Sequence, residues 1–339
     1  MKRMLLWAAG LLLLAGCGGT NTEKAVTLNG AGATFPSPVY ANWTYNFTQF
    51  THGQTQVNYQ GVGSGAGVRQ LREGTIDFAG TDSPLTAEEL EKEGFAQIPM
   101  LAGGVVVVVN IPGVETNRLN LDAAVLADIY LGKITKWNAP EIARDNPDLT
   151  LPDLEIVPIY RADGSGTSFL FTSFLSKVSP AWKSSVGAGA AVRFPVGLGG
   201  QKNPGVCNNV MKIPGSVGYT EYTYAVEMKL ACVCLRNAAG KCVVPNSASF
   251  TASLAGVDWK EEPGFRVDLT NAPGENSYPV TGVTYLVYRK TLEEPKRSEL
   301  FRYIAWCFRD GKAKATEMEY VPLPPEVVEV VLASLGESK

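Results

Sequence analysis

The pattern that most constrains this chain is a short apolar strand that runs into a glycine-rich turn and then into a helix. The turn sequences are GAGATF (30–35), GVGSGAG (61–67) and RADGSGTS (161–168). Short β-like runs precede these turns, and segments with helical spacing of apolar residues follow them. Strands that alternate with helices in this way predict an α/β fold with a parallel sheet.

The rest of the chain continues this alternation. The run VVVVV (105–109) is apolar and β-branched, which suits a strand buried on both faces. Thr86 and Glu89 have the spacing of a capping box at a helix start. We expect strands within 26–35, 56–63, 75–82, 105–109, 156–163, 213–225 and 282–288, a loop at 196–203, and helices after residue 36 and at 64–71, 86–93, 121–132, 166–177, 295–310 and 324–334.

The two ends of the chain carry matching α/β pieces around a central α/β insert. A length of 339 residues allows about two domains. We therefore expect one lobe from residues 26–101 and 282–339 and a second lobe from residues 102–281. Two extended segments would join the lobes, a shape that can close on a ligand.

The first residues have the pattern of an export signal that is removed from the mature protein. Lys2 and Arg3 form a positive start, and an apolar run at 5–14 is too short to span a membrane. The sequence LAGC ending at Cys17 resembles the bacterial lipobox, in which the cysteine is lipidated; an ordinary signal with a chance cysteine is the alternative. We expect a signal at 1–17, a flexible tether at 18–25, and an exported protein anchored to the periplasmic or outer face of a membrane.

The charge of the mature chain argues against nucleic acid as a partner. Loss of Lys2 and Arg3 would leave 28 basic residues against 33 acidic ones, a net charge of −5. The sequence also contains no basic run. A mildly acidic protein is poorly suited to general binding of nucleic acid.

The cysteines that remain after Cys17 permit disulfides in an exported protein. Their number is odd, so at least one thiol is unpaired within the chain. Residues 237–241 (NAAGK) have the composition of a hairpin turn, which favours a bridge between Cys242 and either Cys232 or Cys234. A zinc site is the alternative, but the spacing matches no familiar zinc pattern. The five residues are Cys207, Cys232, Cys234, Cys242 and Cys307.

The three glycine-rich turns share the chemistry of an anion site. A helix start offers unpaired backbone N–H groups and the positive end of the helix dipole. Glycine lets a ligand approach the backbone, and Ser or Thr adds a neutral donor. In open α/β sheets, ligands bind beyond the carboxyl ends of the strands, where these turns lie. The alternative is that each turn merely caps a helix, with Ser64 near an N-cap.

Three charged residues at these turns suggest which anion is bound. Arg161 could form a bidentate contact to a tetrahedral oxyanion, with Asp163 holding it in place. Asp82 follows the strand TIDFAGT and would repel an anion unless that anion had a proton to donate. Phosphate carries such a proton near neutral pH and sulfate does not, so Asp82 would select phosphate. A surface ion pair and an N-capping aspartate are the alternatives.

Several of these stretches together resemble the phosphate-binding proteins (PstS family) of the high-affinity phosphate ABC importer. The resemblance runs from about residue 26 to the C-terminal helices and is strongest at RADGSGTSF. It is carried by GAGATFPSPVYANW, VNYQGVGSGAGVRQL, TIDFAGTDSPL, NIPG, DIYLGKITKWN, RADGSGTSFLFTSFL, VGLGGQKN and IPGSVGY.

This resemblance implies a type II periplasmic-binding fold with a dehydrated phosphate between two lobes. It also implies a monomer that delivers phosphate to the membrane subunits of an ABC permease and needs no cofactor or metal. Asp163 would orient Arg161 without touching the ligand. The positions that would contact phosphate are Thr34, Phe35, Ser64, Asp82, Arg161, Ser165, Gly166 and Thr167.

Other functions find less support in the residues. A hydrolase elbow needs G-x-S-x-G, and both Ser64 and Ser165 lack its first glycine. His52 is the only histidine, so a catalytic triad has a single candidate base and a metal phosphatase lacks the several histidine ligands it would need. A receptor for another oxyanion remains as an alternative, which the role of Asp82 would test. A surface scaffold with no affinity for phosphate also remains.

Overall fold

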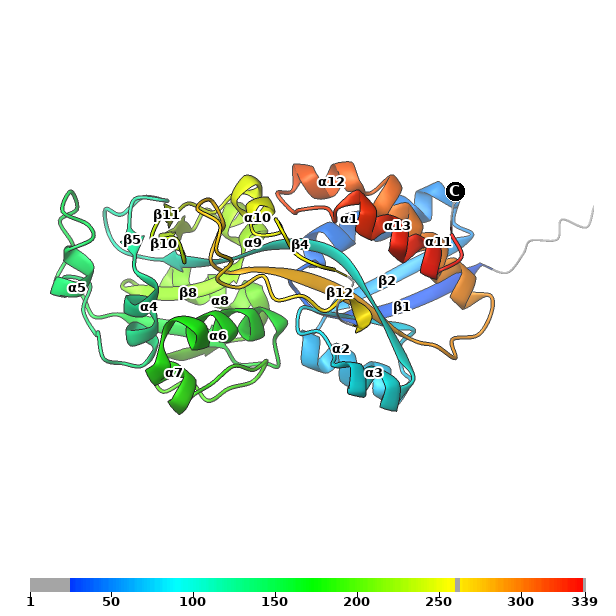
Figure 1. Cartoon of the computed structure of the whole chain (residues 1–339), viewed down its shortest axis with the longest axis horizontal. Helices are drawn as coiled ribbons and strands as arrows, with labels where there is room; N and C mark the ends of the chain where they lie inside the picture. The colour runs from blue at the N-terminus through cyan, green and yellow to red at the C-terminus, as the bar shows by residue number, and fades with distance from the viewer. Residues whose placement is uncertain (1–24, 260–262, 338–339) are drawn as a thin grey trace, which may run out of the picture.

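A computed structural model describes residues 25–259 and 263–337 of the chain. Figure 1 shows two groups of helices and strands joined by two long strands, β4 (Phe95–Val109) and β12 (Thr281–Arg289). We call the group that contains both ends of the described chain the first lobe and the other group the second lobe. The predicted signal, the lipidated Cys17 and residues 18–24 of the predicted tether lie outside the described residues.

The first lobe is built on parallel strands in the order β2-β1-β3, with β12 and β4 added antiparallel to them. Helices from the beginning and the end of the chain cover this part of the sheet (Figure 1). Its other elements are β1 (Val26–Gly32), α1 (Ser37–Phe50), β2 (Thr55–Gly61), α2 (Ser64–Glu73), β3 (Phe78–Thr81), α3 (Ala87–Glu93), α11 (Lys296–Arg309), α12 (Lys312–Glu317) and α13 (Pro325–Ser334).

The second lobe continues the same sheet in the order β4-β8-β6-β7, of which β8, β6 and β7 are mutually parallel. A small second sheet has the order β11-β10-β5. The elements are β5 (Asn120–Leu121), α4 (Ala123–Tyr130), α5 (Pro140–Ala143), β6 (Val157–Arg161), α6 (Gly166–Val178), α7 (Pro180–Ser185), β7 (Leu198–Gly200), α8 (Lys202–Lys212), β8 (Ser216–Glu221), α9 (Tyr222–Glu227), β9 (Ala231–Cys232), β10 (Cys234–Arg236), β11 (Cys242–Val243) and α10 (Ser247–Ala252). The 3-10 turn Pro263–Phe265 follows α10 in the chain but lies against the first lobe, where Gln97 of β4 donates to the carbonyl of Gly264.

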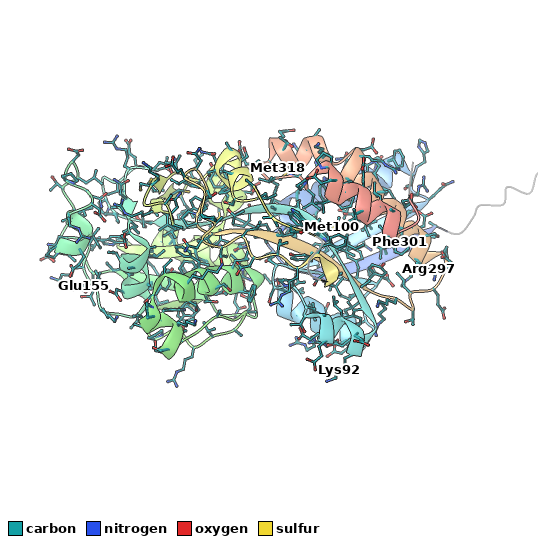
Figure 2. All side chains as sticks on the ribbon, in the orientation of Figure 1. Lys92, Met100, Glu155, Arg297, Phe301 and Met318 are labelled. Carbon is teal, nitrogen blue, oxygen red and sulfur yellow. The ribbon has the colours of Figure 1, made fainter. Side chains whose placement is uncertain are left out.

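Strand β4 links the two lobes because its two parts have different partners. Phe95 to Gly104 pair with β12, whereas Val105 to Val109 pair with β8. The predicted lobe boundary at residues 101/102 therefore falls inside β4, and the one at 281/282 falls at the start of β12. All of Val105 to Val109 are buried, which confirms the expectation that this run is covered on both faces. Figure 2 shows the buried Met100 of the same strand in the interior of the molecule.

One local expectation was wrong. Residues 196–203 were expected to form a loop, but they contain β7 and the first residues of α8. Helix α8 has the sequence KNPGVCNNVMK, whose Pro, Gly and Asn have low helix propensity, so that packing rather than local preference stabilises it. The parallel arrangement predicted from the alternating strands and helices is confirmed for β1, β2 and β3, and the antiparallel strands β12 and β4 make the whole sheet mixed.

The cysteine hairpin forms as expected, but the expected disulfide is absent. Strands β10 and β11 pair across the turn, and the five cysteines from Cys207 to Cys307 are free. The register places Cys242 opposite Arg236, so neither Cys232 nor Cys234 is directly across from it. The side chains of Cys234 and Cys242 nevertheless contact one another through a hydrogen bond, so these two thiols are neighbours that are not bridged in this structure.

Candidate anion-binding site

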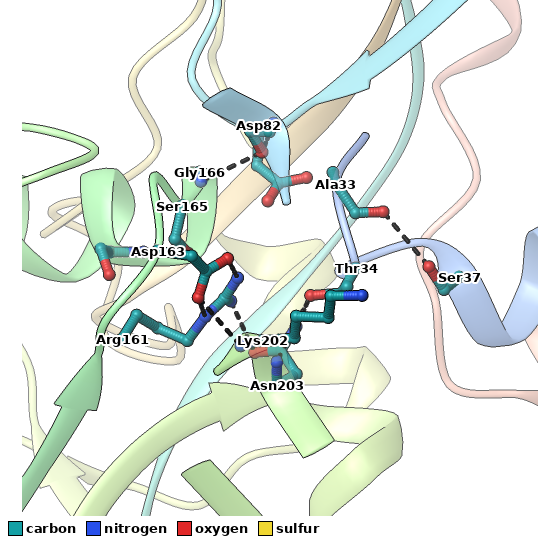
Figure 3. Close-up of polar contacts among 12 residues, drawn as sticks. Ala33, Thr34, Ser37, Asp82, Arg161, Asp163, Ser165, Gly166, Lys202 and Asn203 are labelled. Carbon is teal, nitrogen blue, oxygen red and sulfur yellow. Dashed lines mark hydrogen bonds and ion pairs between the residues drawn. The ribbon is translucent and has the colours of Figure 1, made fainter. Parts of the chain in front are cut away.

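The three glycine-rich turns meet where the two lobes touch. The first lobe supplies the turn after β1, the start of α2 and the residue after β3; the second lobe supplies the end of β6 and the starts of α6 and α8. Figure 3 shows Asp82 and Thr34 on one side and Arg161, Ser165 and Asn203 on the other. These positions lie beyond the carboxyl ends of β1, β3 and β6, the usual place for a ligand in an open α/β sheet.

Direct hydrogen bonds join the lobes at this place. The backbone N–H of Gly166 donates to Oγ of Ser64 at 3.1 Å. The backbone N–H of Gly65 donates to the carbonyl of Gly164 at 3.0 Å. The lobes are therefore closed on one another around the site.

Glycine at position 63 makes this close approach possible. Its φ of 95° is in the region that favours glycine. A Cβ atom there would lie 2.5 Å from Oδ2 of Asp163 in the other lobe. Ser64 lies near the N-cap of α2, as expected: Gly63 is the cap residue, Ser64 is the first residue of the helix, and the Ser64 hydroxyl contacts α6.

Arg161 is buried and held on several sides. Its Nε and Nη2 donate to the two carboxylate oxygens of Asp163 at 2.9 and 2.6 Å, and Nη1 donates to Oδ1 of Asn203 at 3.3 Å. Asp163 also accepts from the backbone N–H of Lys202 at 2.9 Å. Burial raises the pKa of Asp163, but the hydrogen bonds and charge of Arg161 outweigh burial and leave that pKa below its usual value. The structure thus orients a fixed positive charge into the site.

Asp82 is the carboxylate that faces this positive charge from the first lobe. Its side chain is 1% exposed, and its Oδ1 accepts from the hydroxyl of Thr284 at 2.8 Å. Burial raises the pKa of Asp82 to about 7, against the lowering effects of the Thr284 hydrogen bond and of Arg161. A Cβ on Gly166 would lie 2.6 Å from Oδ2 of Asp82, which places this carboxylate at the start of α6. A carboxylate with such a pKa can exchange a proton with an anion near pH 7.

Some of the hydrogen-bond donors at the start of α6 are bonded to other protein groups, and others have no partner. Ser165 caps the helix, since its Oγ accepts from the N–H of Ser168 at 3.1 Å, and its own N–H donates to Ala190. Its hydroxyl hydrogen can still be donated. Thr167 is buried, and its Oγ1 has no hydrogen-bond partner among the residues that the structure describes. An unsatisfied buried hydroxyl costs about 1–3 kcal/mol, so it indicates a group completed by a ligand.

The turn after β1 is fixed through its carbonyl groups. Tyr224 donates to the carbonyl of Thr34 at 2.7 Å, and the hydroxyl of Tyr320 lies 2.8 Å from the carbonyl of Phe35. Phe35 is fully buried. The hydroxyl oxygen of Thr34 accepts from Asn203, so what it can still offer the site is its own hydrogen.

The structure brings the three predicted turns together and adds three residues that the sequence analysis did not name. Asn203 is fully buried and links Arg161 to Thr34, to which its Nδ2 donates at 3.1 Å. It was missed because its segment was expected to be a loop. Thr284 is a single polar residue within the buried run GVTYLVY, and that isolation was the signal available.

The third missed residue, Tyr219, lies under Arg161. Its hydroxyl accepts from the N–H of Arg161 at 3.1 Å and lies 2.6 Å from Oγ of Ser168. It therefore ties the end of β6 to the first turn of α6.

Within the described residues, no cluster of three or more His, Cys, Asp or Glu side chains is arranged to hold a metal ion. The same part of the chain contains no helix with the length and hydropathy needed to cross a bilayer.

Comparisons with known proteins agree with this architecture. A family model described as a PBP superfamily domain matches residues 19–310. The phosphate-binding protein PstS of Pasteurella multocida is 45% identical over 313 residues, covering 92% of this chain and 90% of that protein. PstS of Xylella fastidiosa is 43% identical over 311 residues, covering 91% of this chain and 85% of that protein.

A solved structure supports the fold alone. The phosphate-binding protein from Stenotrophomonas maltophilia has a TM-score of 0.68 and 20% identity, covering 91% of this chain and 94% of that chain. The predicted α/β periplasmic-binding fold is therefore confirmed.

Proposed function

Because the chain belongs to the PstS family of phosphate-binding proteins, within the PBP superfamily, we propose that it captures inorganic phosphate between its two lobes and delivers it to an ABC permease. The family expected from the sequence is confirmed. This family consists of substrate-binding proteins, so the chain is not an enzyme.

The observation that carries the proposal is a buried carboxylate opposite a buried guanidinium at one helix start. Asp82 and Arg161 are 1% and 5% exposed. A simple anion site would gain nothing from Asp82, because two negative charges repel. An anion that brings its own hydrogen turns that repulsion into a charge-assisted hydrogen bond.

Phosphate would be held from both lobes. The first lobe offers the hydroxyl of Thr34, the N–H of Phe35, Ser64 and the acceptor Asp82. The second lobe offers Arg161, held in place by Asp163, together with the hydroxyls of Ser165 and Thr167. The N–H of Gly166 donates to Ser64 in this structure and would turn to the ligand when phosphate binds. Closure would be favoured by the ligand because only the closed form gathers both sets.

The proposal extends to the membrane. The LAGC sequence at Cys17 supports an acyl anchor, and residues 18–25 would connect it to β1. Two or more acyl chains give stable attachment where one does not. The receptor would then remain close to the permease as a monomer on the outer or periplasmic face.

Calorimetry on residues 25–339 with phosphate, sulfate and molybdate tests this function. We expect binding of one phosphate per chain and far weaker binding of the anions that carry no proton. Similar affinity for sulfate would support the alternative oxyanion receptor, and no affinity for phosphate would support a scaffold. Turnover of a generic phosphoester would contradict the assignment as a binding protein.

A further inference from the structure

A second buried carboxyl group lies behind the phosphate turn. Glu221 ends β8 and caps α9, and it is 1% exposed. Its Oε1 accepts from the N–H and the hydroxyl of Thr223 at 3.0 and 3.2 Å. Its Oε2 lies 3.1 Å from the hydroxyl oxygen of Tyr320.

The hydroxyl of Tyr320 has two neighbours that both need a hydrogen. Besides Oε2 of Glu221, it lies 2.8 Å from the carbonyl oxygen of Phe35. A phenol has one hydrogen to donate, and a carbonyl or carboxylate oxygen has none. If Glu221 were ionised, one of these two contacts would be between oxygens with no hydrogen between them.

Both contacts are satisfied if Glu221 carries the missing hydrogen. The carboxylic acid then donates to Tyr320, and Tyr320 donates to the carbonyl of Phe35. This chain of hydrogen bonds crosses between lobes, because Glu221 belongs to the second lobe and Tyr320 and Phe35 to the first. A second contact crosses between the lobes here, because the hydroxyl oxygen of Thr223 lies 3.1 Å from the carbonyl oxygen of Met318, and its single hydrogen is shared between that carbonyl and Oε1 of Glu221.

We propose that Glu221 is a neutral carboxylic acid in the closed protein and that, through Tyr320, it positions the turn at Phe35 for phosphate. This role rests on the proposed function, because Phe35 is expected to donate its N–H to the ligand. Residue 36 is proline, so the peptide group of the Phe35 carbonyl has no N–H, and its hydrogen bond to Tyr320 holds the Phe35 backbone on the C-terminal side. The N–H of Phe35 lies in the preceding peptide group, whose Thr34 carbonyl accepts from Tyr224, so the two tyrosines together fix the direction of this N–H. Glu221 is thus a positioning residue that does not touch the anion.

The surroundings of Glu221 favour the neutral form. Burial raises the pKa of Glu221 to about 8, although the hydrogen bonds from Thr223 and Tyr320 lower it; the charge of Asp82 raises it further. The guanidinium of Arg161 is committed to Asp163. The titratable groups that interact with Glu221 from the surrounding elements, within the described residues, are Asp82, Cys207, Tyr222, Tyr224 and Tyr320.

The sign of the pH effect follows from this raised pKa. Below pH 8 the acid is protonated, and the chain through Tyr320 is intact. Above pH 8 Glu221 loses its proton, which breaks the chain and adds a negative charge behind a turn that binds an anion. Phosphate affinity should therefore fall by up to about tenfold per pH unit above pH 8.

The substitution Glu221→Gln keeps an uncharged hydrogen-bonding side chain at this position and removes its ability to lose a proton. Glutamine keeps a donor for Tyr320 and an acceptor for Thr223, but it cannot ionise. We expect phosphate affinity within about twofold of wild type at pH 7, measured by calorimetry, and no loss of affinity between pH 8 and 9.5. Glu227→Gln, on the exposed side of the same helix, is the control and should keep the wild-type pH profile.

Tyr320→Phe provides a second variant, which removes the hydroxyl without adding charge. It should weaken binding at pH 7, because the link to Phe35 is lost. It should also make the loss of affinity above pH 8 smaller than in wild type, since only the charge of ionised Glu221 then acts on the site. Carbon-13 NMR of labelled glutamate should show the Glu221 carboxyl still protonated at pH 7, assigned by its absence in Glu221→Gln.

Three results would overturn the positioning role. The first is a Glu221→Gln variant that still loses phosphate affinity above pH 8 as wild type does. The second is phosphate binding by Glu221→Gln that is more than about tenfold weaker than wild type at pH 7. The third is a carbon-13 chemical shift that shows Glu221 ionised at pH 7. If Glu221→Gln does not fold, a wild-type pH profile in Tyr320→Phe overturns it equally. A wild-type protein that binds no phosphate at any pH would instead refute the proposed function.

Discussion

Replacement of Asp82 by asparagine should make the unliganded protein more stable while it removes selectivity for phosphate. The side chains have the same shape, and the Oδ1 of asparagine can still accept from Thr284, as Asp82 does at 2.8 Å. The substitution removes the negative charge and replaces the second carboxylate oxygen, an acceptor, by an NH₂ group, which is a donor. The variant therefore tests the carboxylate without disturbing its packing.

The size of the stability change follows from the pKa of Asp82. It rises from 3.8 to about 7 on folding, chiefly through burial. A raised acid pKa means that the contribution of this group to stability is complete below pH 3.8 and is lost as pH rises through 7. The difference of roughly three pKa units corresponds to about 4 kcal/mol above pH 7, a penalty that asparagine does not have.

The effect on binding has the opposite sign. Phosphate loses an acceptor for its proton, which should cost about 1.5–3 kcal/mol, or roughly 10- to 150-fold in affinity. Sulfate no longer meets a negative charge and should bind more tightly than it does to wild type. Selectivity for phosphate over sulfate should therefore largely disappear.

Urea unfolding at pH 4 and pH 8 and calorimetry with both anions measure these effects. The variant should gain stability at pH 8 and little at pH 4. Asp128→Asn, which removes a surface carboxylate 2.8 Å from Lys133, is the matched control and should leave anion selectivity unchanged. Wild-type selectivity in Asp82→Asn would refute the role of the carboxylate as proton acceptor, and equal stability at pH 8 would refute the argument from burial.

Three further substitutions test the geometry of the site, all by calorimetry with phosphate. Arg161→Ala should weaken binding by about 1.5–3 kcal/mol, and full affinity would remove this guanidinium from the site. Gly63→Ala should weaken binding roughly tenfold, because its Cβ would meet Asp163 at 2.5 Å in the closed form; wild-type affinity would show that this contact is dispensable. Thr284→Val should raise the pKa of Asp82 further and weaken binding at pH 7, and an unchanged affinity would contradict the role of its hydroxyl.

The sequence by itself determined the elements around the site. Alternation of strands and helices, glycine-rich turns and the apolar run at 105–109 are local patterns, and each predicts local structure through hydrogen bonding or burial. The turns that contain Thr34, Ser64 and Arg161 were therefore found directly. Asp82 was singled out because a carboxylate next to donors for an anion would repel that anion, unless the anion has a proton to donate.

Only the tertiary structure decided which groups meet between the lobes. Asn203 and Thr284 are 81 residues apart in sequence, and each contacts a site residue from a strand or helix that local patterns do not connect to it. The hydrogen bonds of Glu221 and Tyr320 likewise depend on how β8 and the segment before α13 pack together. Burial also sets the pKa of Asp82 and Glu221, and burial is a property of the packed fold, not of any short stretch of sequence.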